Sequence, residues 1–223
     1  MPIHTTKPDV NLVVKCLWFA CASSAQTYLR TEKSRESYEI HFWRVFSGKL
    51  GEYAFVDKLF QKKWIDETEF KEYERGALSI YYGTSNVDKS DLEVNNKTYD
   101  IKTALEKNHK YLIVPTDQWY HHKKDYYIGT KINYKEGLRE FATEQTCKTL
   151  GNNMRNTTGF MASRIKNFNI EIEIHGFLPA DSKKWERSTE KDIICPEFPC
   201  VRVKLSELQD VNNLENMLKI NKK

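Results

Sequence analysis

The residues best suited to chemistry are two aspartates and a lysine in one short stretch of the chain. Asp91 comes first, Asp100 follows in the same stretch, and Lys102 stands two positions after Asp100. Two carboxylates can hold Mg²⁺, a hard cation that prefers oxygen ligands and keeps several waters. A lysine ammonium beside that ion can hold or polarise a water. Hydrolysis of a phosphodiester needs this set, because it requires a Lewis acid, an activated water and stabilisation of the leaving oxygen.

A hairpin would bring these side chains to one edge of a sheet. Two consecutive asparagines, which tolerate a positive φ, stand between alternating segments, so we expect strands over Asp91–Val94 and Thr98–Thr103. Residues i and i+2 of a strand share a face, so Asp100 and Lys102 project together. Pairing of the two strands can bring Asp91 close to Asp100.

The acid-x-lysine triplet is not specific by itself. It occurs three times in the chain, at Glu69–Lys71, Asp100–Lys102 and Asp181–Lys183. Only the middle triplet combines a predicted strand with an aspartate at the far end of a hairpin. The alternative is a surface hairpin with a cross-strand salt bridge, which would add little to stability.

Other segments extend the pattern. Gly51–Ala54 has the sequence Gly-Glu-Tyr-Ala within a predicted helix ahead of the hairpin. The hairpin itself, from Asp91 to Lys102, has apolar residues, a turn, an aromatic residue and then Asp-Ile-Lys. These motifs resemble the PD-(D/E)XK nuclease superfamily, whose best-known members are type II restriction endonucleases. Ser90 stands where the family name has proline, a position that does no chemistry. Later segments that look like the strands and closing segment of many members are Tyr126–Ile132, Ile172–Leu178 and Val201–Leu208.

The resemblance implies a role for each matching residue. Asp91 and Asp100 would be Mg²⁺ ligands, joined by the backbone carbonyl of Ile101. Lys102 would position the attacking water and offset charge on the phosphate. Glu52 would be a more distant carboxylate that binds a metal directly or through water. The alternative for Glu52 is an exposed helix carboxylate.

A first candidate for DNA contact is the segment Gln118–Lys124, which packs aromatic, imidazole and basic residues into a short, irregular stretch. Lys123 and Lys124 can contact phosphates. Gln118 can in principle read adenine. The alternative is a solvated loop with one buried aromatic residue.

A second candidate is the polar segment Lys148–Arg164. Asn152, Asn153 and Arg155 are of the residue types that pair bidentately with adenine and guanine in the major groove. We hypothesise that they help base recognition. The alternative is a polar linker before the following strand.

Five cysteines occur in a chain without a recognisable secretion signal, which favours a reducing compartment and free thiols. Cys16 and Cys21, with Cys195 and Cys200, offer four thiolates to zinc. Their spacing of four intervening residues is at the edge of the usual ligand spacing, however. Cys16 also lies in an apolar run where a buried thiol is ordinary, so we favour free thiols.

The elements that must position these residues follow from hydrophobic periodicity. Gly48 and Gly51 weaken the middle of the second helical stretch, which is therefore two helices or one kinked helix. Helices are expected over Leu12–Leu29, Glu36–Lys62, Glu67–Leu78 and, closing the chain, Ser206–Ile220. Besides the hairpin, strands are expected over Lys110–Pro115, Asp125–Ile132 and Ile170–Leu178.

Length and composition favour one folded unit. The 223 residues predict a single domain over residues 1–223, with residues 1–35 as a helical N-terminal extension, and the family resemblance implies that it is a nuclease domain. The predicted class is α/β (α+β), with a mixed central β-sheet flanked by helices. The family resemblance implies that the core is restriction-endonuclease-like. Aromatic residues make up 13% of the chain, which excludes disorder. No apolar run reaches the roughly 18 residues of a membrane span, and no signal peptide is evident, so we expect a cytoplasmic protein.

The function that follows is Mg²⁺-dependent hydrolysis of DNA. The net charge of +4 permits a polyanionic partner. The first expectation is a type II restriction endonuclease that cuts double-stranded DNA at a specific site. Such an enzyme would act as a homodimer, because a twofold protein matches a palindromic target. Two alternatives stay open: a repair, resolving, viral or phage nuclease of the same fold, and a nucleic-acid-binding protein without catalysis. Metal binding at the two aspartates separates the last of these from the nucleases.

Overall fold

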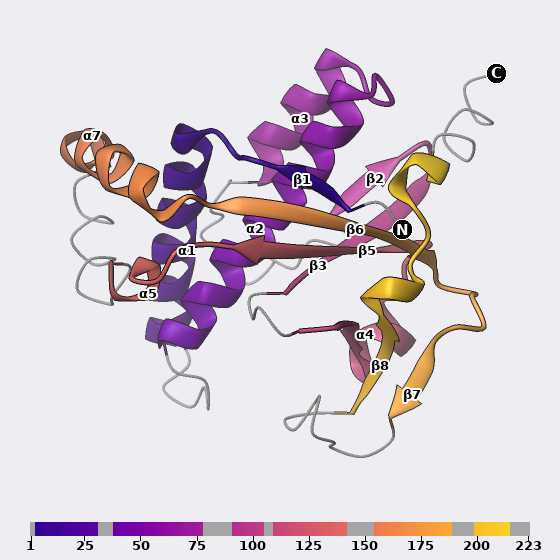
Figure 1. The fold of residues 1–223 in the computed structure, drawn as a ribbon. Helices are drawn as coiled ribbons and strands as arrows, with labels where there is room; N and C mark the ends of the chain where they lie inside the picture. Colours follow the sequence, from indigo (N-terminus) through magenta and orange to yellow (C-terminus); the bar gives the residue numbers. More distant parts are fainter. Residues whose placement is uncertain are drawn as a thin grey trace.

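The computed structural model describes residues 3–30, 38–77, 91–104, 109–141, 154–188 and 199–214. Its strands form a large sheet in the order β1-β6-β5-β3-β2 and a small sheet in the order β4-β8-β7. In Figure 1 the large sheet crosses the molecule and the small sheet lies below it. The strands are β1 (His4–Thr6), β2 (Leu92–Val94), β3 (Lys97–Ala104), β4 (Tyr111–Pro115), β5 (Tyr126–Asn133), β6 (Glu171–Pro179), β7 (Glu186–Ser188) and β8 (Cys200–Lys204).

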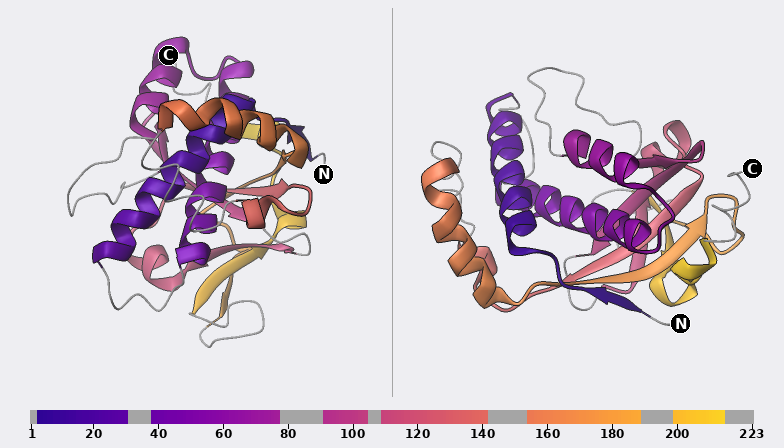
Figure 2. Two further views of the ribbon diagram at one scale, coloured as in Figure 1. Left: turned by 90° about the vertical axis from the view of Figure 1, so that its left-hand side faces the viewer. Right: turned by 90° about the horizontal axis from the view of Figure 1, so that it is seen from above.

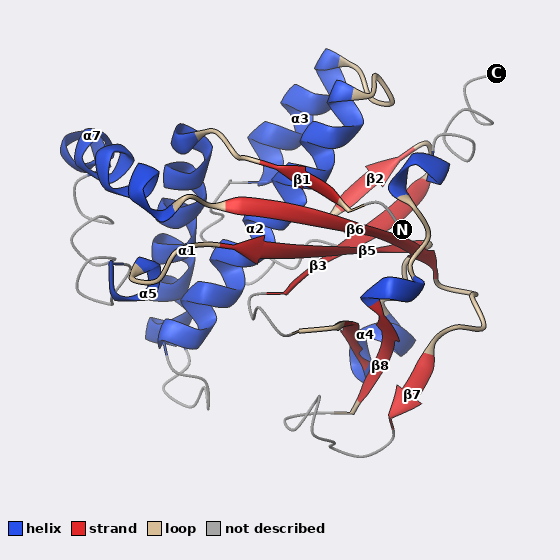
Figure 3. Ribbon diagram, viewed as in Figure 1, coloured by secondary structure: helices blue, strands red, loops and turns tan. Residues whose placement is uncertain are grey.

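The three long N-terminal helices lie on one side of the large sheet, as the view from above shows (Figure 2, right). In Figure 3, the long helices (blue) and most of the strands (red) occupy different parts of the molecule. The α-helices are α1 (Val10–Arg30), α2 (Tyr38–Gln61), α3 (Glu67–Ala77), α4 (Thr116–His121), α5 (Leu138–Phe141) and α7 (Met154–Ile165). The 3₁₀ helices are η1 (Lys166–Phe168), η2 (Leu205–Glu207) and η3 (Val211–Asn213). The expected mixed α/β class, with a mixed sheet flanked by helices, is confirmed.

The predicted hairpin is confirmed. β2 and β3 pair antiparallel, with Leu92 opposite Tyr99. The connecting residues Asn95 and Asn96 have φ values of 52° and 59°, the positive values that a tight two-residue hairpin requires. β3 then pairs in parallel with β5, and β5 pairs antiparallel with β6. The hairpin is therefore fixed to the centre of the large sheet through β3.

Helix α2 is one continuous helix, so its two glycines do not divide it. At Gly51 an added Cβ would collide with the hydroxyl oxygens of Thr103 and Thr130. Glycine is thus needed where α2 comes closest to β3 and β5. This close approach places Glu52, the next residue of the helix, against the sheet.

The two faces of the large sheet are covered differently. On the helical face, Tyr99 and Ile101 of β3 pack in one apolar cluster with Phe55 and Leu59 of α2. On the opposite face, the small sheet, α4 and η2 pack against the large sheet. The cluster between them contains Leu112, Val114, Trp119, Tyr127, Leu178, Ala180, Val201, Val203, Leu205 and Leu208.

Two expected elements differ from the structure. Gln118–Lys124 is not wholly irregular, because its first part belongs to α4, whose Trp119 is buried in the cluster between the sheets. The closing helix does not begin at Ser206. Instead, η2 and η3 flank a backbone bridge between Gln209 and Phe177, which ties the chain to β6. The rest of that predicted helix, from residue 215 onward, lies outside the described residues.

The first residues of the chain join the rest of the fold. β1 pairs antiparallel with β6, with His4 opposite Ile174. α1 contributes Val13 and Leu17 to an apolar cluster that also contains Phe46 of α2. Within the described ranges, no helix combines the length and apolarity needed to cross a membrane.

Candidate functional site

The hairpin brings the two predicted aspartates and the lysine together. Asp91 precedes β2, and its Oδ2 accepts a hydrogen bond of 2.6 Å from the backbone N–H of Ile101. Lys102 Nζ lies 2.9 Å from Asp100 Oδ2. The N–H and C=O of one strand residue point to the same side of the strand. The Ile101 carbonyl is therefore directed to the side on which Asp91 lies.

Strand alternation decides which way these side chains point. Ile101 is buried against α2, so Asp100 and Lys102 project from the opposite face of β3. Their side chains are 13% and 26% exposed. In the parallel register Asp100 lies beside Tyr127 of β5. Burial raises the pKa of Tyr127 to about 12, and the Asp100 carboxylate adds to that increase.

Glu52 is buried, which excludes the alternative of an exposed helix carboxylate. The residue is 7% exposed. Its Oε2 accepts hydrogen bonds from Lys49 Nζ at 2.7 Å and from the Tyr73 hydroxyl at 3.3 Å. Lys49 precedes Glu52 by three positions on α2, and Tyr73 comes from α3. Helix α3 therefore helps to fix the orientation of this carboxylate.

We call Lys49, Glu52, Asp91, Asp100 and Lys102 the site cluster. Burial raises the pKa of Asp91 well above its usual range, and the carboxylates of Glu52 and Asp100 raise it further. The Ile101 N–H and the Lys102 ammonium oppose this increase without cancelling it. Asp91 is therefore subject to an excess of nearby negative charge, an arrangement that a cation would relieve.

Sequence reasoning missed Lys49 and Tyr73. A spacing of three residues on a helix is the signal that would have paired Lys49 with Glu52. Tyr73 gave no comparable signal, because its contact depends on how α3 packs against α2. Burial, followed by the Glu52 carboxylate, raises the pKa of Tyr73 well above its usual range, so this hydroxyl is a stable donor.

Gln118 lies beside the site cluster. Its Oε1 accepts a hydrogen bond of 3.1 Å from Lys102 Nζ. Lys123 lies farther along, with Nζ 5.0 Å from the centre of the Trp119 ring. The backbone N–H of Lys124 donates to the Tyr127 hydroxyl. Of the predicted DNA-contacting residues in this segment, Gln118 therefore contacts the site directly.

The second segment predicted to contact DNA, Lys148–Arg164, does not lie beside the site cluster where it is described. Asn152 and Asn153 lie outside the described residues. Arg155 is in the first turn of α7. Met161 and Ile165 of that helix pack in the apolar cluster around α1, and Figure 1 shows α7 far from β2. The start of α7 is thus separate from the site cluster.

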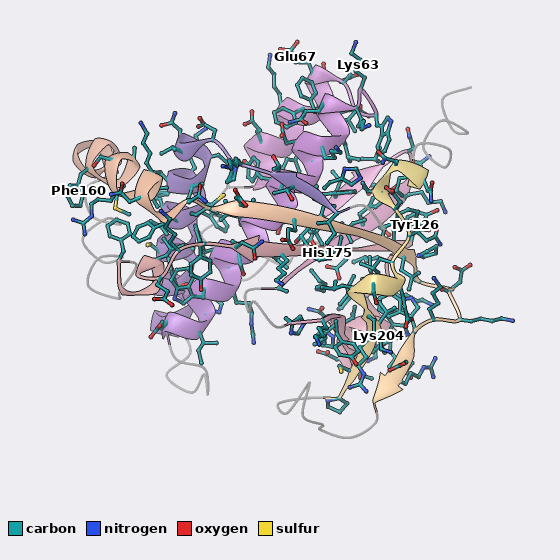
Figure 4. All side chains as sticks on the ribbon, viewed as in Figure 1. Lys63, Glu67, Tyr126, Phe160, His175 and Lys204 are labelled. Atoms are coloured by element: carbon teal, nitrogen blue, oxygen red, sulfur yellow. The ribbon has the colours of Figure 1, made fainter. Side chains whose placement is uncertain are left out.

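A second polar cluster lies on β5 and β6, and we call it the β5–β6 cluster. Glu173 Oε2 is 3.0 Å from His175 Nε2, and Glu173 Oε1 accepts a hydrogen bond of 2.6 Å from Asn133 Nδ2. Figure 4 shows His175 on the large sheet, away from Lys204 of the small sheet. Burial lowers the pKa of His175, although Glu173 opposes that change.

The donor chemistry of Asp91 and Asp100 fits a hard divalent cation, because both offer carboxylate oxygens. Across the parts of the chain that are described, however, no three His, Cys, Asp or Glu residues come together as a metal-binding group. Glu52 contacts Lys49 and Tyr73 instead. Among the cysteines considered for zinc, Cys16, Cys21 and Cys200 are buried free thiols, and Cys195 lies outside the described residues.

Comparisons with protein-family models, curated proteins and solved structures found no match to this chain.

Proposed function

We propose that this chain is a Mg²⁺-dependent endodeoxyribonuclease with a restriction-endonuclease-like core. One observation carries the proposal. Asp91 and Asp100 come together at the end of a hairpin, Lys102 projects from the same strand face as Asp100, and Glu52 adds its charge to that of Asp91. A surface hairpin with a simple salt bridge would not need a third, buried carboxylate beside it.

The arrangement of strands also supports the proposal. The resemblance to PD-(D/E)XK nucleases predicts a glutamate-bearing helix, the catalytic hairpin and then further core strands. Here α2 packs over the hairpin, and β5 and β6 follow β3 in the same sheet. The two segments that resemble the family's following strands, Tyr126–Ile132 and Ile172–Leu178, belong to these strands.

Each residue has a distinct task in this proposal. Asp91, Asp100 and the carbonyl of Ile101 would hold Mg²⁺, which when bound supplies a Lewis acid for the phosphate. Lys102 holds the attacking water and offsets negative charge on the phosphate. Gln118 holds the Lys102 ammonium from one side while Asp100 holds it from the other.

The proposed target is double-stranded DNA, cut at a specific site by a homodimer. A twofold arrangement would present one site cluster to each strand of a palindromic sequence. Lys123 and Lys124, which follow α4, are candidates for phosphate contacts, and Asn152, Asn153 and Arg155 stay candidates for base recognition.

The test is a cleavage assay on a mixture of plasmid and phage DNAs with Mg²⁺ or with EDTA. The wild-type chain is compared with Asp100→Asn and with the control Glu173→Gln, which changes a carboxylate of the β5–β6 cluster. We expect discrete Mg²⁺-dependent fragments from the wild type and the control, and none from Asp100→Asn. Equal cleavage by Asp100→Asn would contradict the assignment of the site.

Other outcomes of the same assay would favour one of the two alternative functions, a different nuclease of the same fold or a protein that binds nucleic acid without cutting it. A smear or a nick would keep the chemistry but favour a repair, resolving or viral nuclease. The absence of cleavage on modified, unmodified, branched and single-stranded DNA would favour a nucleic-acid-binding protein without catalysis.

A further inference from the structure

Lys49 is a fixed cation behind the proposed metal ligands. Its Nζ is 2.7 Å from Glu52 Oε2, and the side chains of Lys49 and Glu52 are only 14% and 9% exposed. The same ammonium lies 5.6 Å from the centre of the Phe19 ring of α1. Contacts from two helices therefore hold this positive charge in place, where little water can screen it.

Glu52 is already engaged by this cation. The family resemblance implies that Glu52 binds a metal, directly or through water. Its Oε2, however, already accepts hydrogen bonds from Lys49 Nζ and from the Tyr73 hydroxyl. A divalent ion at Glu52 would have to displace the ammonium or bind close to it. Repulsion between two cations at such a short distance is strong in a buried site.

The distribution of charge along the site cluster leads to the same conclusion. Glu52 and Asp100 each contact a lysine, but the two lysines differ. Lys102 is more exposed than Lys49, at 26% against 14%, and it shares its ammonium with Gln118, so it can shift aside for an ion more easily. Asp91 Oδ2 instead accepts a hydrogen bond of 2.6 Å from the backbone N–H of Ile101. The carboxylates of Asp91 and Asp100 are therefore the oxygen donors that a divalent ion can reach without displacing Lys49.

We propose that Lys49 takes the place of a second metal ion beside Glu52, so that each chain binds a single Mg²⁺ at Asp91 and Asp100. This inference rests on the proposed nuclease function and adds its metal stoichiometry. Lys49 is a positioning residue, since it acts through Glu52 and through charge. Glu52 in turn adds a negative charge near Asp91 that attracts the ion, but it is not itself a ligand of the metal.

The test measures Mn²⁺ binding to the full chain without DNA, from the loss of the electron paramagnetic resonance signal of free Mn²⁺. We expect one bound Mn²⁺ in the wild type and in Lys49→Arg, which keeps the charge. We expect two in Lys49→Met, which keeps the length of the side chain but frees Glu52. Lys58→Met, on the same helix but away from the site cluster, is the matched control and should bind one.

A second variant keeps the test decisive if Lys49→Met does not fold, which a thermal unfolding curve would reveal. Glu52→Gln should keep its fold, because the amide oxygen can accept the same hydrogen bonds from Lys49 and Tyr73. It should still bind one Mn²⁺ at Asp91 and Asp100, with lower affinity because a negative charge near the ion is lost. Two Mn²⁺ in the wild type, one in folded Lys49→Met, or none in Glu52→Gln would overturn the role of Lys49 and leave the nuclease proposal standing. No binding in the wild type, or unchanged binding in Asp100→Asn, would overturn the metal site itself and the role of Lys49 with it.

Discussion

The site cluster and the β5–β6 cluster both place carboxylates beside basic side chains on or against the large sheet, but they balance charge differently. In the β5–β6 cluster, both oxygens of Glu173 have partners, His175 and Asn133. In the site cluster, Asp91 accepts one backbone N–H, and the charges of two further carboxylates act on it more strongly than the charge of Lys102 does. The polar groups of the β5–β6 cluster are thus hydrogen-bonded, whereas the carboxylates of the site cluster repel one another.

We expect this difference to distinguish a structural cluster from a functional one more clearly than burial or residue type does. Buried polar groups are normally hydrogen-bonded, and a fully paired group contributes to the fold. A group whose ionised form is disfavoured by its neighbours costs stability, and such costs are concentrated at functional sites. If the two clusters differ in this way, substitutions in them should have different effects on activity and stability.

The largest expected effect separates the two clusters by activity. Lys102→Ala should lower the rate of DNA cleavage by about 10²–10³-fold, because the proposed function directs the charge of Lys102 at the reacting phosphate. Lys131→Ala, beside the β5–β6 cluster, should leave the rate unchanged. Cleavage under single-turnover conditions gives the rates, and a gel-shift assay with Ca²⁺ gives DNA binding. Weakened binding with an intact cleavage rate would assign Lys102 a phosphate contact only.

The next effect concerns the close contact between α2 and the large sheet at Gly51, the residue before Glu52. Gly51→Ala should destabilise the fold by about 1–3 kcal/mol, because the methyl group would collide with Thr103 and Thr130. Gly48→Ala is the matched control on the same helix. An added Cβ there meets nothing within 4 Å, so the fold should gain about 0.5–1 kcal/mol from the better helix former.

Urea unfolding measures both glycine variants. Equal and small effects at the two positions would mean that α2 does not depend on close contact with β3 and β5. Loss of cleavage in folded Gly51→Ala, with full cleavage in Gly48→Ala, would tie that contact to the site.

A third effect reverses sign between the two clusters. The pKa of Asp91 is raised by folding, so its ionisation costs stability as the pH rises from the unfolded pKa toward the folded one. Asp91→Asn should therefore stabilise the metal-free fold at pH 7 by about 0.5–2 kcal/mol. Glu173→Gln should destabilise it, because the variant loses a charged partner of His175. Thermal unfolding in EDTA measures both, and destabilisation by Asp91→Asn would contradict the excess of charge at the site.

The sequence predicted the parts of this site that are encoded locally. The hairpin follows from Asn95 and Asn96, and the shared face of Asp100 and Lys102 follows from strand alternation. Lys49 was missed although its spacing of three residues from Glu52 on one helix offered a signal. Tyr73 was missed because its contact with Glu52 depends on how α3 packs against α2. The small sheet was missed for a similar reason, since β4 pairs with β8 across a long separation in sequence. The restriction-endonuclease-like core and the nuclease function stay predictions.

The smallest expected effect is the pH dependence of the β5–β6 cluster. Burial lowers the pKa of His175 in the folded chain, with Glu173 opposing and Lys131 adding to that change. The unfolded chain therefore binds the proton more tightly, so His175 costs no stability above the unfolded pKa and costs increasingly more as the pH falls toward the folded pKa. His175→Gln should flatten this loss in urea unfolding curves recorded from about pH 8 to 5. A steeper loss in the variant would mean that Glu173 attracts the proton to folded His175, and the cluster would then be balanced by charge rather than by neutral hydrogen bonds.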